Sequence, residues 1–193
     1  MTKNISLSLV LVALTLLTVS CASGPGGNRG MRSNVDARKI DMESRDALNR
    51  LYSNNPVAKD LAKDAAGILV FPEMTKGGFL IAGAWGDGAL YQRGQSAGYY
   101  RSITASYGLQ AGLQEYGYAL FLMDDHAVQN LNRSGGWELG SSPNLTVIDK
   151  GVAGSLSTTT ISSGAFAIFF DQKGLMAGLA LDGTKITRLA IQP

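Results

Sequence analysis

The stretch ILVFPEMTKGGFLIAGAWGDGALY, residues 68–91, decides the fold of this chain. Its apolar run ILVF stops at Pro72, the PEMTKGG segment is typical of a turn, and side chains alternate in character from residue 78 to residue 91. A period of two predicts β-strands. The two faces of the second strand differ: Phe79, Ile81, Trp85 and Tyr91 lie on one, and Gly78, Ala82, Ala84, Gly86 and Gly88 lie on the other.

Glycine also builds phosphate-binding loops, but this segment fits neither common pattern. A Walker loop requires GxxxxGK[ST], which is absent, and GAWGDG is not the GxGxxG turn between a strand and a helix. Small residues at every second position instead predict a strand that a helix or a neighbouring sheet can approach closely.

Further strand-like runs follow along the chain, and turn signals separate several of them. DQKG at 171–174 and the pair Asp182-Gly183 predict hairpin turns. The runs are GYYRSITAS, GLQAGLQEYGYALFLM, NLTVIDKGVAGSLSTTTI, AFAIFF, LMAGLAL and KITRLAI. Because no long helices stand between these strands, the predicted fold class is α+β, with a mostly antiparallel, sandwich or barrel-like sheet rather than a doubly wound parallel one.

Helices are predicted at the start of the domain and once within the strands. Apolar residues near helical spacing predict an amphipathic helix from Val35 to Tyr52. In a second short helix, Asn55 can cap the start and Pro56 suits the first position. The inserted third helix begins after a capping Asp124 or Asp125. The sequence allows two roles for the first two helices: ordinary packing on the sheet, or contact with a membrane surface.

The N-terminus has the features of an export signal. Lys3 precedes an apolar run at residues 5–19, which is shorter than the roughly 20 residues that a membrane-spanning helix needs. Residues 1–20 resemble a bacterial lipoprotein signal, which implies that Cys21 becomes the lipid-modified first residue; the alternative is an ordinary secretory signal with a free thiol. Residues 21–34 would then be the lipidated cysteine and a flexible tether, before a domain at 35–193.

Composition and residue inventory argue against several functional classes. A net charge of +2 is too small for a dedicated nucleic-acid binder, and one Cys and one His exclude an internal disulfide and the usual zinc cluster. There is no G-x-S-x-G elbow, and His126 is the only histidine. Asp124 and Asp125 are typical of helix caps rather than of a catalytic pair. We therefore expect a protein that is not an enzyme and needs neither metal nor cofactor.

Several ordered blocks resemble a known family. The blocks AAGILVFPEMTKGGFLIAGAWGDGALY, GYYRSITASYGLQAG, ALFLMDDHAVQNL, GWELG, VIDKGVAGSLSTT and QKGLMAGLALDGTKITRL resemble the SYLF (Ysc84-related) domain over about residues 35–191. Eukaryotic members of that family bind phosphoinositide-containing membranes, and some bind actin. For a bacterial lipoprotein, the resemblance implies affinity for acidic phospholipid head groups.

Candidate head-group contacts come from basic residues near turns and on the first helix. Lys76 is the first choice, because it stands in a Gly-bordered segment where backbone N–H groups could help a cation to hold a phosphate. The other candidates are Arg38, Lys39, Arg45, Arg93 and Arg101, with Lys150, Lys173 and Lys185 in or beside later turns. The alternative is that these cations are separate, solvated side chains.

Two functions follow from these expectations. The first is a lipid-anchored, non-enzymatic envelope protein whose domain binds acidic phospholipid membranes. The second is a structural or interaction lipoprotein whose β domain binds an envelope protein, with the acyl anchor supplying all membrane affinity. Because Ala22 follows Cys21, the resemblance to lipoproteins favours the outer membrane, with the domain facing the periplasm.

Overall fold

The computed structural model describes residues 29–78, 81–107, 114–133, 135–140, 144–148, 164–173, 181, 183–191 and 193. The helices are α1 (Arg29–Asn54), α2 (Pro56–Asp64) and α3 (Asp125–Asn130). The strands are β1 (Gly67–Gly78), β2 (Ile81–Gln92), β3 (Gln95–Tyr107), β4 (Gln114–Leu122), β5 (Trp137–Glu138), β6 (Leu145–Ile148), β7 (Ala165–Lys173) and β8 (Thr184–Arg188).

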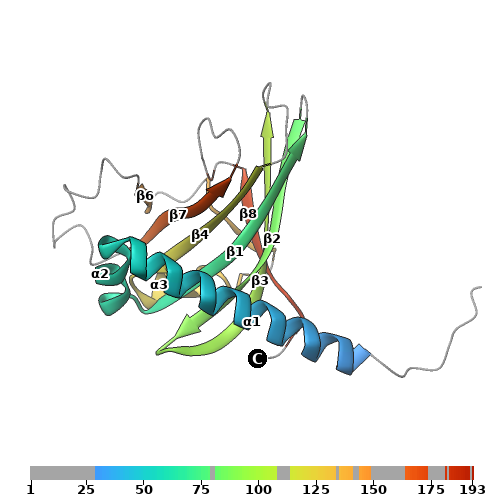
Figure 1. Ribbon diagram of the computed structural model, residues 1–193, viewed down its shortest axis with the longest axis horizontal. Helices are drawn as coiled ribbons and strands as arrows, with labels where there is room; N and C mark the ends of the chain where they lie inside the picture. Colours follow the sequence, from blue (N-terminus) through green and yellow to red (C-terminus); the bar gives the residue numbers. More distant parts are fainter. Residues whose placement is uncertain are drawn as a thin grey trace, which may run out of the picture.

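The described strands form one curled sheet in the order β5-β8-β3-β2-β1-β4-β7-β6 (Figure 1). Every neighbouring pair is antiparallel except β6 and β7, which run parallel. The predicted α+β class with a mostly antiparallel, barrel-like sheet is therefore confirmed, as are the N-terminal helical pair and the inserted helix.

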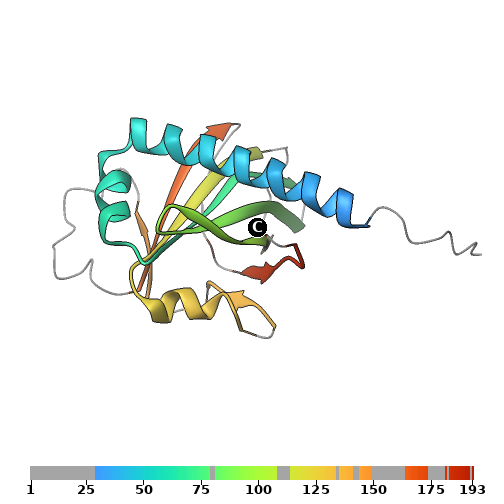
Figure 2. The same cartoon turned by 90° about the horizontal axis from the view of Figure 1, so that it is seen from below.

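Each face of the sheet has its own hydrophobic cluster. α1 and α2 cover one face, where Ala47, Leu51 and Leu61 pack on Val70 and Phe121. The other face carries a second cluster, in which α3 and β5 contribute side chains to those of the central strands. Figure 2 shows α1 on one side of the sheet and α3 with β5 on the other. We call the first of these the helix face.

The deciding stretch forms a hairpin, but its turn is not where the sequence predicts it. PEMTKGG is no turn: β1 continues through Pro72 to Gly78, and its pairing slips between Phe71 and Met74 opposite β4 and between Val70 and Thr75 opposite β2. Proline lacks the N–H that a regular ladder needs, and a bulge is one of the few strand positions that accepts it. The expected turn is thus a β-bulge inside a long strand.

The bulge explains the small residues of β2. A Cβ at Gly88 would overlap the carbonyl oxygen of Val70 and lie 2.7 Å from Cδ1 of Phe71; one at Gly86 would lie 2.7 Å from Sδ of Met74. The close approach that the sequence predicts is present, but the approaching element is the neighbouring strand of the same sheet, not a helix or a second sheet.

The helix caps agree with their predicted signals, but α1 runs from Arg29 to Asn54 and so extends beyond both predicted ends, Val35 and Tyr52. The Asn55 side chain accepts a hydrogen bond from the Ala58 backbone N–H at 3.1 Å, which confirms it as the cap of α2. α1 begins at Arg29, before the predicted start at Val35, so the last part of the segment expected to be a tether is helical. None of the described helices is long and apolar enough to cross a membrane.

Candidate functional site

The structure brings two of the predicted basic residues, Arg45 and Arg93, to one groove. This groove lies between α1, α2 and the β2–β3 hairpin, and its volume is about 810 Å³. We call it the basic groove. Its lining combines cationic side chains with apolar ones and one carboxylate: Arg45, Leu48, Asn49, Tyr52, Ala62, Lys63, Ala65, Ala66, Ile68, Tyr91, Gln92, Arg93, Gly94 and Asp125.

Arg45 is held in place from three directions. Its Nε donates to Asp41 on the preceding helical turn at 2.8 Å, and its Nη1 donates to the Gly94 carbonyl oxygen at 3.5 Å. Its guanidinium also lies over the Tyr91 ring, 4.8 Å from the centroid. The hydrogen bond to Asp41 raises the pKa of Arg45, so the side chain stays charged. A guanidinium has more N–H groups than these contacts use, and the rest remain for a ligand.

Arg93 stands at the tip of the hairpin. Gln92 pairs with Gln95, so Arg93 and Gly94 are the two turn residues, with φ of 50° and 76°. Both values are positive, as a type I′ turn requires. Arg93 is exposed and forms no ion pair with any residue of the described part of the chain.

Beside these two cations, the groove lining has apolar side chains among its polar ones. Leu48 and Tyr52 come from α1, and Ile68 and Tyr91 come from the adjoining strands. Burial raises the pKa of Tyr52 to about 12. The third cation, Lys63, is bound to Asp60 at 2.6 Å, and this hydrogen bond raises its pKa. The arrangement suits a ligand with an anionic group and an apolar part.

α1 carries a second basic stripe beside the groove. Arg38, Met42, Arg45 and Asn49 are separated by four, three and four positions, the spacing of one helix face. The Met42 side chain is 60% exposed, so the stripe contains an apolar side chain between two arginines. Lys39 also lies on α1 and pairs with Glu43 at 3.8 Å.

Arg101 lies elsewhere, on a part of the helix face that α1 does not cover. Arg101 donates to both carboxylate oxygens of Asp87, at 2.7 and 2.8 Å. Beside this pair, Trp85 and Ile103 lie opposite each other on β2 and β3 and are 54% and 51% exposed. With Lys185, which pairs with Ile103 in the ladder, these residues form what we call the tryptophan patch.

Lys76 joins neither surface. In the ladder it pairs with Ala84, a core residue of the face opposite α1, so the two share that face and Lys76 is separated by the sheet from Arg45 and Arg93. Lys173 is bound to Glu115 at 3.2 Å and is the last residue of β7, so residues 171–173 of DQKG continue the strand and are not the predicted hairpin turn. Cys21 and Lys150 lie outside the described residues. The predicted cations therefore occupy at least three places, and only Arg45 and Arg93 line one groove.

Sequence reasoning missed Met42, Tyr91 and the exposed pair Trp85 and Ile103. The spacing of Met42 to Arg38 and Arg45 was readable from the sequence. The stacking of Arg45 on Tyr91 was not, because it depends on how α1 crosses the hairpin.

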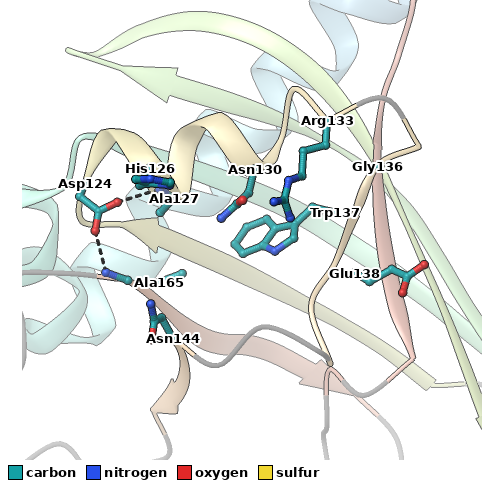
Figure 3. Close-up of a pocket in the computed structure, with 11 residues that line it drawn as sticks. Asp124, His126, Ala127, Asn130, Arg133, Gly136, Trp137, Glu138, Asn144 and Ala165 are labelled. Carbon is teal, nitrogen blue, oxygen red and sulfur yellow. Dashed lines mark hydrogen bonds between the residues drawn. The ribbon is translucent and has the colours of Figure 1, made fainter.

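A second hollow, of about 420 Å³, lies beside α3 (Figure 3). Figure 3 shows Asp124 at one end, with Asn130, Arg133 and Trp137 further along it. The Asp124 carboxylate accepts hydrogen bonds from the backbone N–H groups of Gly164 at 3.0 Å and Ala127 at 2.7 Å, and these bonds lower its pKa. Asp124 is thus the helix cap that the sequence predicts. Among the described residues, no group of three or more His, Cys, Asp or Glu side chains could hold a metal ion.

Comparison with known proteins identifies part of the chain. Residues 103–190 match the family model Ysc84, described as Las17-binding protein actin regulator. Over residues 103–190 this match confirms the family predicted from the sequence blocks, and it does not extend to the blocks before residue 103. The matched span begins in β3, so Arg45 and Arg93 precede it. No curated protein matches the chain.

Proposed function

We propose, on the premise that residues 103–190 place this chain in the Ysc84 (SYLF) family, that it is a lipid-anchored, non-enzymatic envelope protein whose domain binds acidic phospholipid membranes. SYLF domains are a family of lipid- and actin-binding domains rather than enzymes. The observation that carries the proposal is the basic groove, where Arg45 and Arg93 adjoin an apolar floor.

The chemistry of the groove fits a phospholipid surface. Arginine binds phosphate oxygens in a forked geometry, and each Lys or Arg near an acidic membrane contributes on the order of 1 kcal/mol. Arg38 and the exposed Met42 extend this surface along α1. The apolar side chain of Met42 can enter the head-group region while the arginines stay with the phosphates.

The anchor and the location belong to the same proposal. Acylation at Cys21 would hold the domain at the bilayer, since each buried methylene contributes about 0.8 kcal/mol. Attachment to the outer membrane, with the domain in the periplasm, places the groove within reach of phospholipids. Weak contacts in the groove then suffice, because the anchor keeps the local lipid concentration high.

Co-sedimentation with vesicles tests the proposal. We would measure the ratio of partition onto acidic vesicles to partition onto zwitterionic ones, because an apolar anchor contributes equally to both. We expect a ratio well above one at low salt that falls as salt rises. Changing both Arg45→Glu and Arg93→Glu should lower it at least about 10-fold.

The matched control is Asp87→Asn with Arg101→Gln, which removes one ion pair from the tryptophan patch at constant net charge. We expect it to leave the ratio unchanged. A wild-type ratio near one at low salt would show that the domain does not recognise acidic head groups.

The tryptophan patch favours a second candidate function, binding of an envelope protein. Trp85 and Ile103 form an exposed apolar centre, and Arg101 beside them is neutralised by Asp87. An apolar centre with paired charges around it is typical of protein interfaces. Under this function the acyl anchor supplies all membrane affinity, so the vesicle ratio is near one. Trp85→Ala then abolishes partner binding, whereas Arg93→Glu leaves partner binding unchanged.

A further inference from the structure

The hairpin tip contains a residue that its backbone does not favour. Arg93 has φ of 50°, in the left-handed region that side chains other than Gly, Asn and Asp seldom adopt. A type I′ turn prefers Asn-Gly at its two central positions. Here Gly94 satisfies the second preference, but Arg93 does not satisfy the first.

Nothing in the described fold requires an arginine at this position. Arg93 is exposed and has no ion-pair partner among the described residues. Asparagine would relieve the backbone and keep the turn. A strained residue that the fold does not use points to a function.

The neighbourhood of Arg93 indicates which function. Arg45 lines the same groove, and its contact with Gly94 ties α1 to this turn. Asp41 neutralises part of the charge of Arg45, and Asp125 lines the groove as well. The positive charge is therefore limited, which suits a singly charged phosphodiester better than a doubly charged phosphate. The apolar floor favours a phosphodiester that carries acyl chains.

We infer that Arg93 and Arg45 form a clamp for the phosphodiester of one acidic phospholipid, whose glycerol and first acyl carbons lie on Leu48, Tyr52 and Ile68. This inference rests on the proposed function and makes it specific: the domain binds a single lipid molecule in a defined groove, beyond general attraction to an acidic surface. Turn strain at Arg93 is the cost of placing its guanidinium over the groove.

The substitution Arg93→Asn separates this function from a structural role. Because asparagine tolerates the left-handed conformation, we expect the variant to fold and its Tm to rise by about 2–4 °C. We also expect its affinity for dihexanoyl phosphatidylglycerol, measured by calorimetry on the full chain in zwitterionic nanodiscs, to fall about 10-fold. Arg93→Lys keeps the charge and the strain, and should lose only a few-fold in affinity without the rise in Tm.

The probes identify the source of the phosphate. The wild-type chain should bind dihexanoyl phosphatidylglycerol more tightly than dihexanoyl phosphatidylcholine, which has the same acyl chains but no net charge. It should bind inorganic phosphate at least 10-fold more weakly than the phosphatidylglycerol, because phosphate leaves the apolar floor uncovered. Equal affinity for phosphate and the acidic lipid would overturn the lipid assignment.

The remaining outcomes separate this inference from the proposed function. If the wild-type chain prefers acidic vesicles but Arg93→Asn keeps its full affinity for the short-chain lipid, the clamp is wrong and the proposed function stands. If Arg93→Asn fails to raise the Tm, the strain argument is wrong. If the wild-type chain shows no preference for acidic vesicles, the proposed function itself fails.

Discussion

The basic groove and the tryptophan patch lie on the same face of the sheet, yet their arginines have different roles. In the patch, Arg101 donates twice to Asp87, so the fold itself uses its guanidinium. In the groove, Arg93 stands on a strained turn with no ion-pair partner in the described part of the chain. From the sequence alone, Arg93 and Arg101 are equivalent, because each is a basic residue near a turn. The difference shows that a cation becomes a candidate for binding when the fold leaves its charge unused.

The largest expected effect is a loss of stability that would disrupt the groove and the patch together, because both depend on the β1–β2 pairing. In Gly88→Val, the added side chain would overlap the Val70 carbonyl oxygen and the Phe71 ring. We expect a loss of about 3 kcal/mol or more in the free energy of unfolding, measured by urea denaturation. Gly83→Ala is the matched control, because the nearest atom to its Cβ would be the Thr104 oxygen at 3.9 Å. A Gly88→Val protein as stable as the wild type would contradict the role assigned to the bulge.

Much of this fold could be predicted from local patterns. The period of two in residues 78–91, the cap at Asn55 and the cap at Asp124 are each set by a few neighbouring residues. The structure confirms both caps and, over residues 81–91, the strand; residues 79 and 80, with the predicted position of Phe79, lie outside the described residues. The misplaced turn at PEMTKGG has a physical reason. Proline and glycine mark both turns and bulges, and only the partner strands, which lie far along the chain, decide between them.

The site was less predictable than the fold. Basic residue type and turn position picked out Arg93, but the same criteria picked out Lys76 and Arg101. Whether a strand side chain joins the helix face depends on register, and the bulge shifts the register of Lys76 relative to Leu69 and Phe71. Whether an arginine is neutralised depends on the opposing strand, as Asp87 shows for Arg101. Neither fact is local in sequence.

An effect of intermediate size is expected in the free energy of unfolding at alkaline pH, where a change in the groove and a change in the patch should differ. Burial in the groove wall raises the pKa of Tyr52 to about 12, from about 10 in an unfolded chain. The folded state thus favours the protonated phenol, so the stabilisation is fully present below pH 10 and is lost as the pH rises to 12. We expect the free energy of unfolding to fall less steeply over this range in Tyr52→Phe than in the wild type.

Other buried tyrosines share this sign, since burial also raises the pKa of Tyr91 and Tyr118. The substitution therefore removes only part of the slope. Trp85→Ala, which changes the patch without touching a phenol, should leave the slope as it is. A slope unchanged by Tyr52→Phe would mean that Tyr52 is as accessible as in the unfolded chain, and that the groove wall is open.

The smallest expected effect is the change in the free energy of unfolding when the tryptophan patch is altered. Trp85 is 54% exposed, whereas Trp137 is 4% exposed and belongs to the core. An exposed cross-strand pair such as Trp85 and Ile103 contributes roughly 0.2–1 kcal/mol. We therefore expect Trp85→Ala to lower the free energy of unfolding by less than about 1 kcal/mol. The same change should remove the acrylamide-accessible part of the tryptophan fluorescence and leave the shielded emission of Trp137.

This small loss would sharpen the comparison between the two regions, because a large aromatic side chain that contributes little to stability is a cost to solubility unless something binds it. A loss of several kcal/mol would instead make Trp85 part of the structural core. The patch would then stabilise the fold, as its ion pair between Asp87 and Arg101 does, and Arg93 would remain the arginine whose charge the fold leaves unused.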